Sequence, residues 1–219
     1  MHPQRALNEE GYLALERAAE FKSEFYDGRM VAMAGAREPH NLVAFNASVA
    51  IGRRLTGSCR GYTSDMKVRV PAGFNFYPDV SVACAEPQFH DSGNDILLNP
   101  ILIVEVLSPS TEAVDRGRKF ELYRTIPSLR AYLLIAQDRV QVDLYLRQDD
   151  NRWVLTSVSA LDDTLDLTNP IGCQFPLSEL YRNVTLPAQK TCCPRRLELE
   201  LDGEGAIGCD ERERMLVRL

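Results

Sequence analysis

One apolar segment, residues 101–108 with the sequence ILIVEVLS, constrains the fold of this chain more than any other stretch. Its nearly continuous run of β-branched and aliphatic residues predicts a strand that is buried on both faces of a sheet. Glu105 lies in the middle of this run. Because an ionised carboxylate taken out of water costs several kcal/mol unless a cation or hydrogen-bond donors meet it, we expect a partner for Glu105.

A second carboxylate opens another apolar strand. Asp79 directly follows Pro78 and precedes the apolar residues 80–84. Since proline is tolerated at the first residue of a strand, where no ladder donor is needed, Asp79 should lie at the mouth of the sheet. Two strands that each bring one carboxylate would form an oxygen-rich pocket suited to Mg²⁺.

A third group of charged residues follows the Glu105 strand. Residues 110–126 predict a helix in which Glu112, Asp115 and Lys119 fall at i, i+3 and i+7 on one stripe. Metal-assisted phosphodiester hydrolysis needs carboxylates to hold the metal and a cation to offset charge at the phosphate or to orient water. The alternative is a surface pair of Asp115 and Lys119, worth only about 0.3 to 0.5 kcal/mol.

Two residues nearer the N-terminus are possible accessories to this site. Glu24 lies in the first strand of a hairpin predicted around Asp27-Gly28, a dipeptide that favours the type I′ turn. Its side chain either points toward the site or pairs at the surface with a neighbouring cation. His40 lies in the first turn of a helix predicted for residues 39–55, where it is either a cap or surface group or a residue that contacts substrate or orients a carboxylate.

The remaining pattern predicts a mixed α/β chain. We expect a first helix at residues 8–21, short strands at 59–63 and 66–70, a loop at 88–99 and a short helix at 177–181. The strand, helix and strand at 101–136 suggest a right-handed parallel crossover, and the alternating residues 141–147 and 152–158 predict an antiparallel meander. Residues 187–219 lack clear periodicity, so we expect a poorly ordered C-terminal extension after a domain at 1–186.

Charge and composition restrict the class of protein. The chain has 219 residues, a formal net charge of −6 and a hydrophobic share of 45%, as in an ordinary globular domain. The negative charge argues against a generic nucleic-acid coat but not against a nuclease, because three short basic groups could face DNA. These are residues 53–54, 67–69 and 116–119, and each is alternatively a solvated face.

Membrane, secretion and cysteine signals are weak. No apolar run approaches the roughly 20 residues of a membrane span, and the N-terminus lacks the apolar core of a signal peptide, so we expect a cytoplasmic protein.

The 6 cysteines lack the paired spacing of a zinc site. We therefore predict neither a zinc site nor a disulfide framework, with Cys84 packed as a small hydrophobic residue.

Several segments together resemble a known family. They are residues 11–13, 24–28, 39–41, 77–80, 105–111 and 115–119, and Tyr123. In this order they resemble the Uma-type restriction endonuclease family, a domain of unknown function placed in the PD-(D/E)XK nuclease superfamily, over roughly residues 5 to 185. The resemblance implies a restriction-endonuclease-like mixed β-sheet flanked by helices, with Mg²⁺ or Mn²⁺ held by Asp79 and Glu105.

The chain departs from the superfamily at one position. The superfamily's lysine stands two residues after the glutamate, and here that residue is Leu107, which cannot bind phosphate or water. Lys119 on the following helix is the candidate to supply the missing ammonium group.

The leading functional hypothesis is a metal-dependent DNA endonuclease with Asp79, Glu105 and Lys119 as catalytic residues, acting as a homodimer on DNA and not at a membrane. The alternative is a catalytically inactive module of nuclease fold that binds or regulates, with Leu107 as the sign of decay. A third hypothesis, a glycosidase-like carboxylate pair, would require an acid and a base set apart rather than converging on one ion.

Overall fold

The computed structural model describes residues 7–33 and 35–187. By its internal contacts the chain divides into two units, Met1–Ala188 and Gln189–Leu219, and every described residue belongs to the first. The C-terminal extension predicted for residues 187–219 lies outside the described residues, Pro187 excepted.

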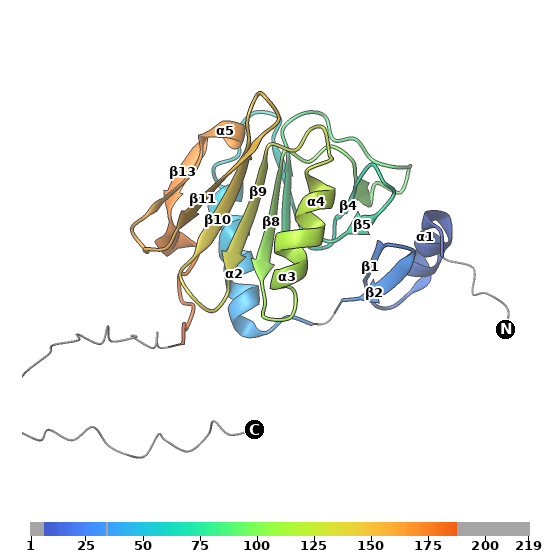
Figure 1. Cartoon of the computed structure of the whole chain (residues 1–219), viewed down its shortest axis with the longest axis horizontal. Coiled ribbons are helices and arrows are strands. Elements are labelled where there is room, and N and C mark those ends of the chain that lie inside the picture. Colours follow the sequence, from blue (N-terminus) through green and yellow to red (C-terminus); the bar gives the residue numbers. More distant parts are fainter. Residues whose placement is uncertain (1–6, 34, 188–219) are drawn as a thin grey trace, which may run out of the picture. The chain divides into compact units, whose positions relative to one another are not determined.

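A six-stranded mixed sheet forms the centre of the first unit (Figure 1). Its strands, in spatial order, are β11 (Trp153–Val158), β10 (Val142–Arg147), β9 (Ala131–Ala136), β8 (Leu102–Leu107), β6 (Val80–Ala83) and β3 (Arg60–Thr63). Only β8 and β9 pair in parallel, and the other neighbours are antiparallel. Every residue of β8 and β9 is buried, as their continuous apolar runs predict.

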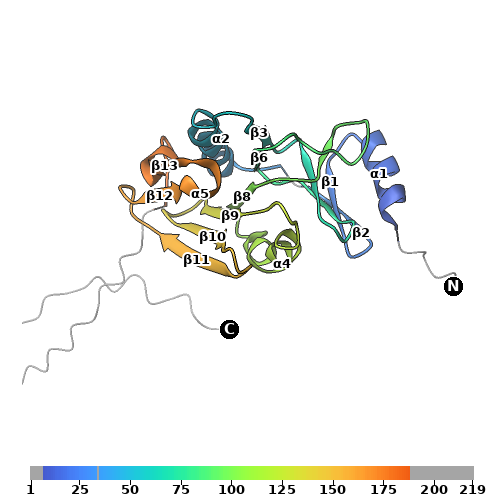
Figure 2. The ribbon, with the colours of Figure 1, turned by 90° about the horizontal axis from the view of Figure 1, so that it is seen from above.

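Helices cover both faces of this sheet (Figure 2). On one face α2 (Glu38–Gly52) packs with the hairpin of β12 (Thr164–Leu167) and β13 (Cys173–Pro176), together with the short helices α5 (Thr168–Ile171) and η2 (Leu177–Glu179). On the other face lies the helix that connects β8 to β9. This helix has three parts: α3 (Glu112–Val114), the π-helical turn η1 (Asp115–Lys119) and α4 (Phe120–Tyr123).

A smaller, five-stranded sheet borders the face that α4 covers. Its spatial order is β2 (Arg29–Ala32), β1 (Ser23–Tyr26), β5 (Asn75–Phe76), β4 (Lys67–Arg69) and β7 (Ile96–Leu97), and α1 (Glu9–Ala18) precedes it in the chain. The β1–β2 hairpin turns at Asp27 and Gly28, whose φ angles of 51° and 72° are the positive values that the type I′ turn requires. This confirms the predicted hairpin.

The sequence patterns missed the smallest elements. The two-residue strands β5 and β7 and the β12–β13 hairpin were not expected, and β7 lies inside the predicted loop. Strands β5 and β7 carry too few residues to display a period of two, so their pairing depends on neighbours that are distant in the chain. The four-residue strands β12 and β13 do alternate between exposed and buried residues, and this signal was missed. The first helix also ends at Ala18, earlier than predicted, because Ala19 adopts an extended conformation.

The prediction that the chain has no disulfide is wrong within the described residues. Cys59 and Cys84 form a disulfide. The antiparallel pairing of β3 with β6 sets Arg60 opposite Ala83, so the next residues outward, Cys59 and Cys84, face each other across the two strands. Their separation of 25 residues in sequence carries no sign of this pairing. Cys84 is therefore a bridged residue rather than a free hydrophobic one.

Among residues 7–33 and 35–187, no helix has both the length and the apolar character to cross a membrane.

Asp95 joins α1 to the smaller sheet, and its replacement tests that connection. The carboxylate accepts hydrogen bonds from Arg17 at 2.7 Å and Lys67 at 3.0 Å, and the Arg17 contact is the main cause that lowers its pKa to about 2. A depressed folded-state pKa stabilises the protein above the ordinary value and ceases to do so as the pH falls through about 2. Because Asp95 is partly solvated, we expect Asp95→Asn to lower the free energy of unfolding by only about 1 kcal/mol at neutral pH.

The measurement is urea unfolding of the wild type and Asp95→Asn across the acid range. The two curves should converge as the pH falls toward the folded-state pKa of Asp95. Identical curves at neutral pH would contradict a stabilising role for this contact.

Candidate active site

Glu105 lies on the face of β8 that α4 covers. Side chains alternate along the strand, so Glu105 shares this face with its apolar neighbours Ile103 and Leu107. One carboxylate oxygen, Oε1, accepts hydrogen bonds from Lys119 Nζ at 3.2 Å and from Tyr123 Oη at 3.0 Å. Burial raises the pKa of Glu105 well above its ordinary value; Lys119 opposes this shift, and three nearby carboxylates add to it. The partner that the sequence required is therefore a lysine and a tyrosine from one helix.

Lys119 is the centre of a buried cluster of carboxylates. Besides Glu105, its ammonium group lies 2.9 Å from Glu24 Oε1 and 3.3 Å from Asp115 Oδ1. Burial alone would lower the pKa of Lys119, but the surrounding carboxylates outweigh that effect and raise it well above the ordinary value. Lys119 therefore stays charged, and the surface pair with Asp115 considered from the sequence does not exist as such, because both residues are buried.

Glu24 reaches the cluster from the smaller sheet. It lies in β1, and its Oε1 also accepts a hydrogen bond from the backbone N–H of Tyr77 at 3.2 Å. Of the two interpretations open from the sequence, the structure supports the one in which Glu24 points toward the site. The surface alternative fails because Glu24 is buried and its cation is Lys119, while the neighbouring Lys22 pairs with Asp65.

Asp79 approaches from the neighbouring strand. Antiparallel pairing sets Val80 opposite Val104, so Asp79, one residue before, falls opposite Glu105 and on the same face of the sheet. Asp79 Oδ2 accepts a hydrogen bond from the backbone N–H of Val106 at 2.7 Å and lies 3.5 Å from His40 Nε2. Burial raises the pKa of Asp79, against the opposing effects of His40, the Val106 amide and Lys119.

His40 belongs to the first turn of α2 and is half-buried beside Asp79. Its Nδ1 is buried without a hydrogen-bond partner, and the same holds for Asp115 Oδ1 within the part of the chain that the structure describes. The position of His40 beside a carboxylate agrees with the interpretation that it orients one. Asp79 and His40 have the most exposed side chains of the site, at 15% and 17%, so they form its accessible side.

The donor set fits a hard divalent cation. Among the described residues, the hydrogen bonds and ion pairs of Glu105 go to Oε1 and those of Asp79 go to Oδ2, which leaves one oxygen of each carboxylate available. No group of three or more His, Cys, Asp or Glu side chains suited to a metal ion occurs in the described parts of the chain. Mg²⁺ is commonly bound through one or two carboxylates and several waters, so two free oxygens match its needs.

One residue predicted for this cluster faces elsewhere. Glu112 binds Arg116 at 2.8 Å and Arg139 at 3.1 Å and takes no part in the contacts around Lys119. Arg116 and Arg139 hold the Glu112 carboxylate outside the cluster, whereas Asp115 and Lys119, at the two ends of the π-helical turn η1, contact each other within it. The α-helical stripe expected for all three residues is therefore wrong for Glu112.

The structure also clarifies the departure at Leu107. Leu107 is 3% exposed and packs in the core, so it contributes no polar group. Lys119, one helix later, brings an ammonium group to Glu105 from another backbone position.

The contact of Tyr123 with Glu105 is one that the sequence analysis did not predict, although Tyr123 belongs to the family resemblance. The sequence signal for this contact was the spacing of four residues between Lys119 and Tyr123, which puts both side chains on one helical face.

The basic groups proposed to face DNA are all engaged in ion pairs within the chain. Their partners are Glu179 for Arg53 and Arg54, Glu16 and Asp95 for Lys67, Glu9 for Arg69, Glu112 and Asp143 for Arg116, and Asp27 for Arg118.

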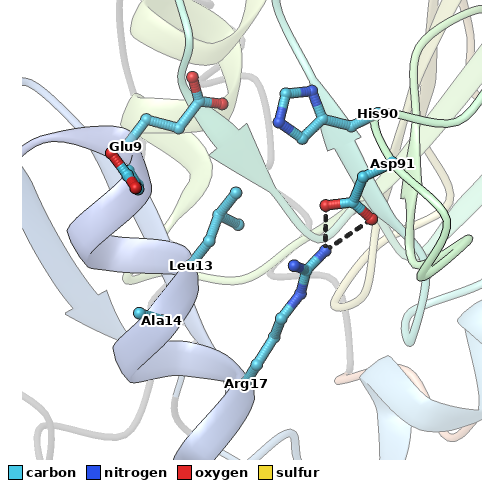
Figure 3. Close-up of a pocket in the computed structure, with 7 residues that line it drawn as sticks. Glu9, Leu13, Ala14, Arg17, His90 and Asp91 are labelled. Atoms are coloured by element: carbon cyan, nitrogen blue, oxygen red, sulfur yellow. Dashed lines mark hydrogen bonds and ion pairs between the residues drawn. The ribbon is translucent and has the colours of Figure 1, made fainter.

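A hollow of about 370 Å³ lies away from this cluster, beside α1 (Figure 3). Figure 3 shows Arg17 bound to Asp91 across it, with His90 alongside. None of the candidate site residues lines this hollow. The carboxylate of Asp91 is paired with Arg17 at 2.9 Å.

Sequence comparisons relate this chain to one family and to two known proteins. The model of the Uma2 family, described as "Putative restriction endonuclease", matches residues 9–178. Two relatives come from Synechocystis sp. (strain ATCC 27184 / PCC 6803 / Kazusa). "Uncharacterized protein slr1290" is 38% identical over 180 residues, or 81% of this chain and 93% of the relative, and "Uncharacterized protein sll1609" is 41% identical over 152 residues, or 67% and 84%.

A solved structure shares the fold. It is titled "Crystal structure of a putative nuclease belonging to DUF820 from Anabaena variabilis ATCC 29413 at 1.96 A resolution". The TM-score is 0.65 at 16% sequence identity, and the match covers 80% of this chain and 97% of that one. The restriction-endonuclease-like mixed sheet flanked by helices is therefore confirmed as the fold class.

Proposed function

Because this chain belongs to the Uma2 family of "Putative restriction endonuclease" proteins, we propose that it is a metal-dependent endonuclease that hydrolyses phosphodiester bonds of DNA. Asp79 and Glu105 would hold Mg²⁺ or Mn²⁺, with Lys119 as the third catalytic residue. Glu24, His40 and Asp115 would be accessory to them.

One observation carries this proposal: negative charge is in excess inside the protein. Four carboxylates, those of Glu24, Asp79, Glu105 and Asp115, surround a single lysine in the cluster. A buried ion pair is tolerated when its charges balance, but uncompensated buried charge is strongly destabilising. Burial is the main cause that raises the pKa values of Asp79 and Glu105, and the neighbouring carboxylates add to the rise: Asp115 at Asp79, and Asp115, Asp79 and Glu24 at Glu105. A divalent cation would remove the excess of negative charge, and a protein without such a ligand has no evident reason to retain it.

Each residue of the site has a distinct task in this proposal. When bound, Mg²⁺ would supply Lewis-acid stabilisation of the phosphate and lower the pKa of a bound water. Lys119 and Tyr123 hold Oε1 of Glu105, so Oε2 would be the oxygen that binds the metal. The Val106 amide and His40 hold Oδ2 of Asp79 in the same way. The ammonium group of Lys119 offsets the charge that develops at the phosphate.

The proposed substrate is DNA, and the proposed assembly is a homodimer, because a two-fold dimer presents one site to each strand of a duplex. We expect the protein to act in the cytoplasm.

The second candidate function is a nuclease-fold module without catalysis. It is favoured by Leu107, which stands at the position of the superfamily's lysine. Metal-dependent cleavage separates the two.

The test is to add and remove metal from the wild-type protein. In Mg²⁺ or Mn²⁺ we expect cleavage of plasmid DNA and a higher melting temperature. Saturation at about 100 times the dissociation constant should add about 2.7 kcal/mol to the free energy of unfolding. In EDTA both effects should vanish.

Glu112→Gln is the matched control for this experiment. Glu112 lies three residues before Asp115 on the same helix but pairs with Arg116 and Arg139, so this variant should keep cleavage and metal stabilisation. Metal stabilisation without cleavage of any DNA form would support the inactive module. A melting temperature that metal leaves unchanged would refute both the metal site and the nuclease.

A further inference from the structure

After Glu38 in its first turn, α2 carries no charged residue on its outward face. Between Pro39 and Gly52 this helix contains no Asp, Glu, Lys or Arg, although it lies on the outer side of the six-stranded sheet (Figure 2). Its inner residues, such as Val43 and Ala47, pack against the sheet. On the outward side Phe45 is 61% exposed, with Val49 one turn further along the helix. A surface helix ordinarily carries charged or polar residues on this side, so a partner is expected to cover it.

A hollow lies on the same surface, about two turns from Phe45. Its volume is about 400 Å³, and Ser48, Gly52 and Leu55 form its wall on the side of α2. Tyr62 and Thr63 of the edge strand β3 form the opposite wall. A Cβ atom added at Gly52 would meet nothing within 4 Å, so the hollow is open beside this residue.

We infer that this face is the interface between two copies of the chain, with Phe45 of each copy inserted into the hollow of the other. A two-fold interface must be complementary to itself, so a projecting group and a receiving hollow have to occur on one surface. Phe45 and Gly52 are seven residues apart, so two antiparallel α2 helices related by an axis near Ser48 bring each Phe45 opposite the partner's hollow.

The charge pattern selects a second copy as the occupant. A two-fold axis brings like residues together, and a charge near it would face its own copy; α2 has none from Pro39 to Gly52. Antiparallel α2 helices also place opposite ends of their dipoles together, which is favourable. Nucleic acid does not suit this face, because residues 39–52 contain no Lys or Arg to neutralise phosphates, and the nearest basic residues, Arg53 and Arg54, already pair with Glu179. The inference deepens the proposed homodimer by naming its surface and does not depend on the nuclease chemistry.

Three variants test the interface by sedimentation equilibrium of the full chain in EDTA without DNA. We expect a dimer for the wild type. Phe45→Ala should weaken dimerisation by about 30-fold or more, the usual effect of truncating a central aromatic residue. Gly52→Leu should abolish dimerisation by filling the hollow, while melting experiments show a folded monomer, because its Cβ meets no neighbour.

The matched control is Leu155→Lys in β11, the opposite edge of the six-stranded sheet, where Leu155 is 49% exposed. This variant should remain a dimer. A monomeric wild type, or a dimer that survives both α2 variants, would overturn the inference. Loss of the dimer in Leu155→Lys alone would overturn it in favour of the β11 edge. Because no cleavage is measured, the result is independent of whether the nuclease proposal holds.

Discussion

We expect Glu105→Gln to abolish divalent-metal binding and DNA cleavage. In EDTA the variant should be as stable as the wild type or more stable, because a glutamate that is retained for a metal costs stability when the metal is absent. The amide is nearly isosteric, and its oxygen can still accept the hydrogen bonds of Tyr123 and Lys119. Lys119 keeps its contacts with Glu24 and Asp115, so no buried cation is left unpaired. The substitution removes one of the excess negative charges, whose burial already raises the pKa of Glu105.

Melting curves in EDTA and in excess Mg²⁺ decide this prediction, together with plasmid cleavage. The wild type should gain stability from Mg²⁺ and the variant should gain none. If Glu105 serves only as a structural partner of Lys119, the variant should instead be less stable than the wild type in EDTA, although Glu24 and Asp115 still pair with the lysine. That loss, with a wild type indifferent to metal, would remove the main support for the nuclease.

Lys119→Met is expected to be the most destabilising single change in the site. Methionine fills a similar volume, but it leaves the carboxylates of Glu24, Glu105 and Asp115 without their shared cation. Breaking a buried ion pair by removing one partner costs about 3 to 5 kcal/mol. DNA cleavage should be lost as well, since the ammonium group is then absent from the site.

The loss in Lys119→Met should depend on pH in a defined direction. Burial holds the pKa of Glu105 above its ordinary value even beside Lys119, and loss of that cation raises it further. A raised folded-state pKa means that the folded protein binds more protons, so its stability is retained at low pH and falls as the pH rises through that pKa. The deficit of the variant should therefore be smaller at about pH 5 than at about pH 8.

Urea unfolding at the two pH values measures this difference. Lys22→Met is the matched control, because Lys22 pairs with Asp65 at an exposed site, where an ion pair contributes about 0 to 1 kcal/mol. A deficit in Lys119→Met no larger than in Lys22→Met would show that the buried cluster does not depend on its lysine.

The sequence alone determined the local features of the protein. The apolar run around Glu105 predicted a strand buried on both faces, and Asp27-Gly28 predicted the hairpin that carries Glu24. Both predictions succeed because they depend on residues that are neighbours in the chain: strand burial follows from the side chains of the strand itself, and the turn follows from the φ angles of two residues.

Only the tertiary structure decided which residues meet. Glu24, Glu105 and Lys119 come from two different sheets and a connecting helix, while Glu112 of the same helix pairs with Arg116 and Arg139 outside the cluster. Likewise, the Cys59–Cys84 bridge follows from the register of β3 against β6, and the basic groups are neutralised by carboxylates from other elements. Such contacts join residues far apart in the chain, so they are set by strand register and helix rotation, and no local sequence period encodes either one.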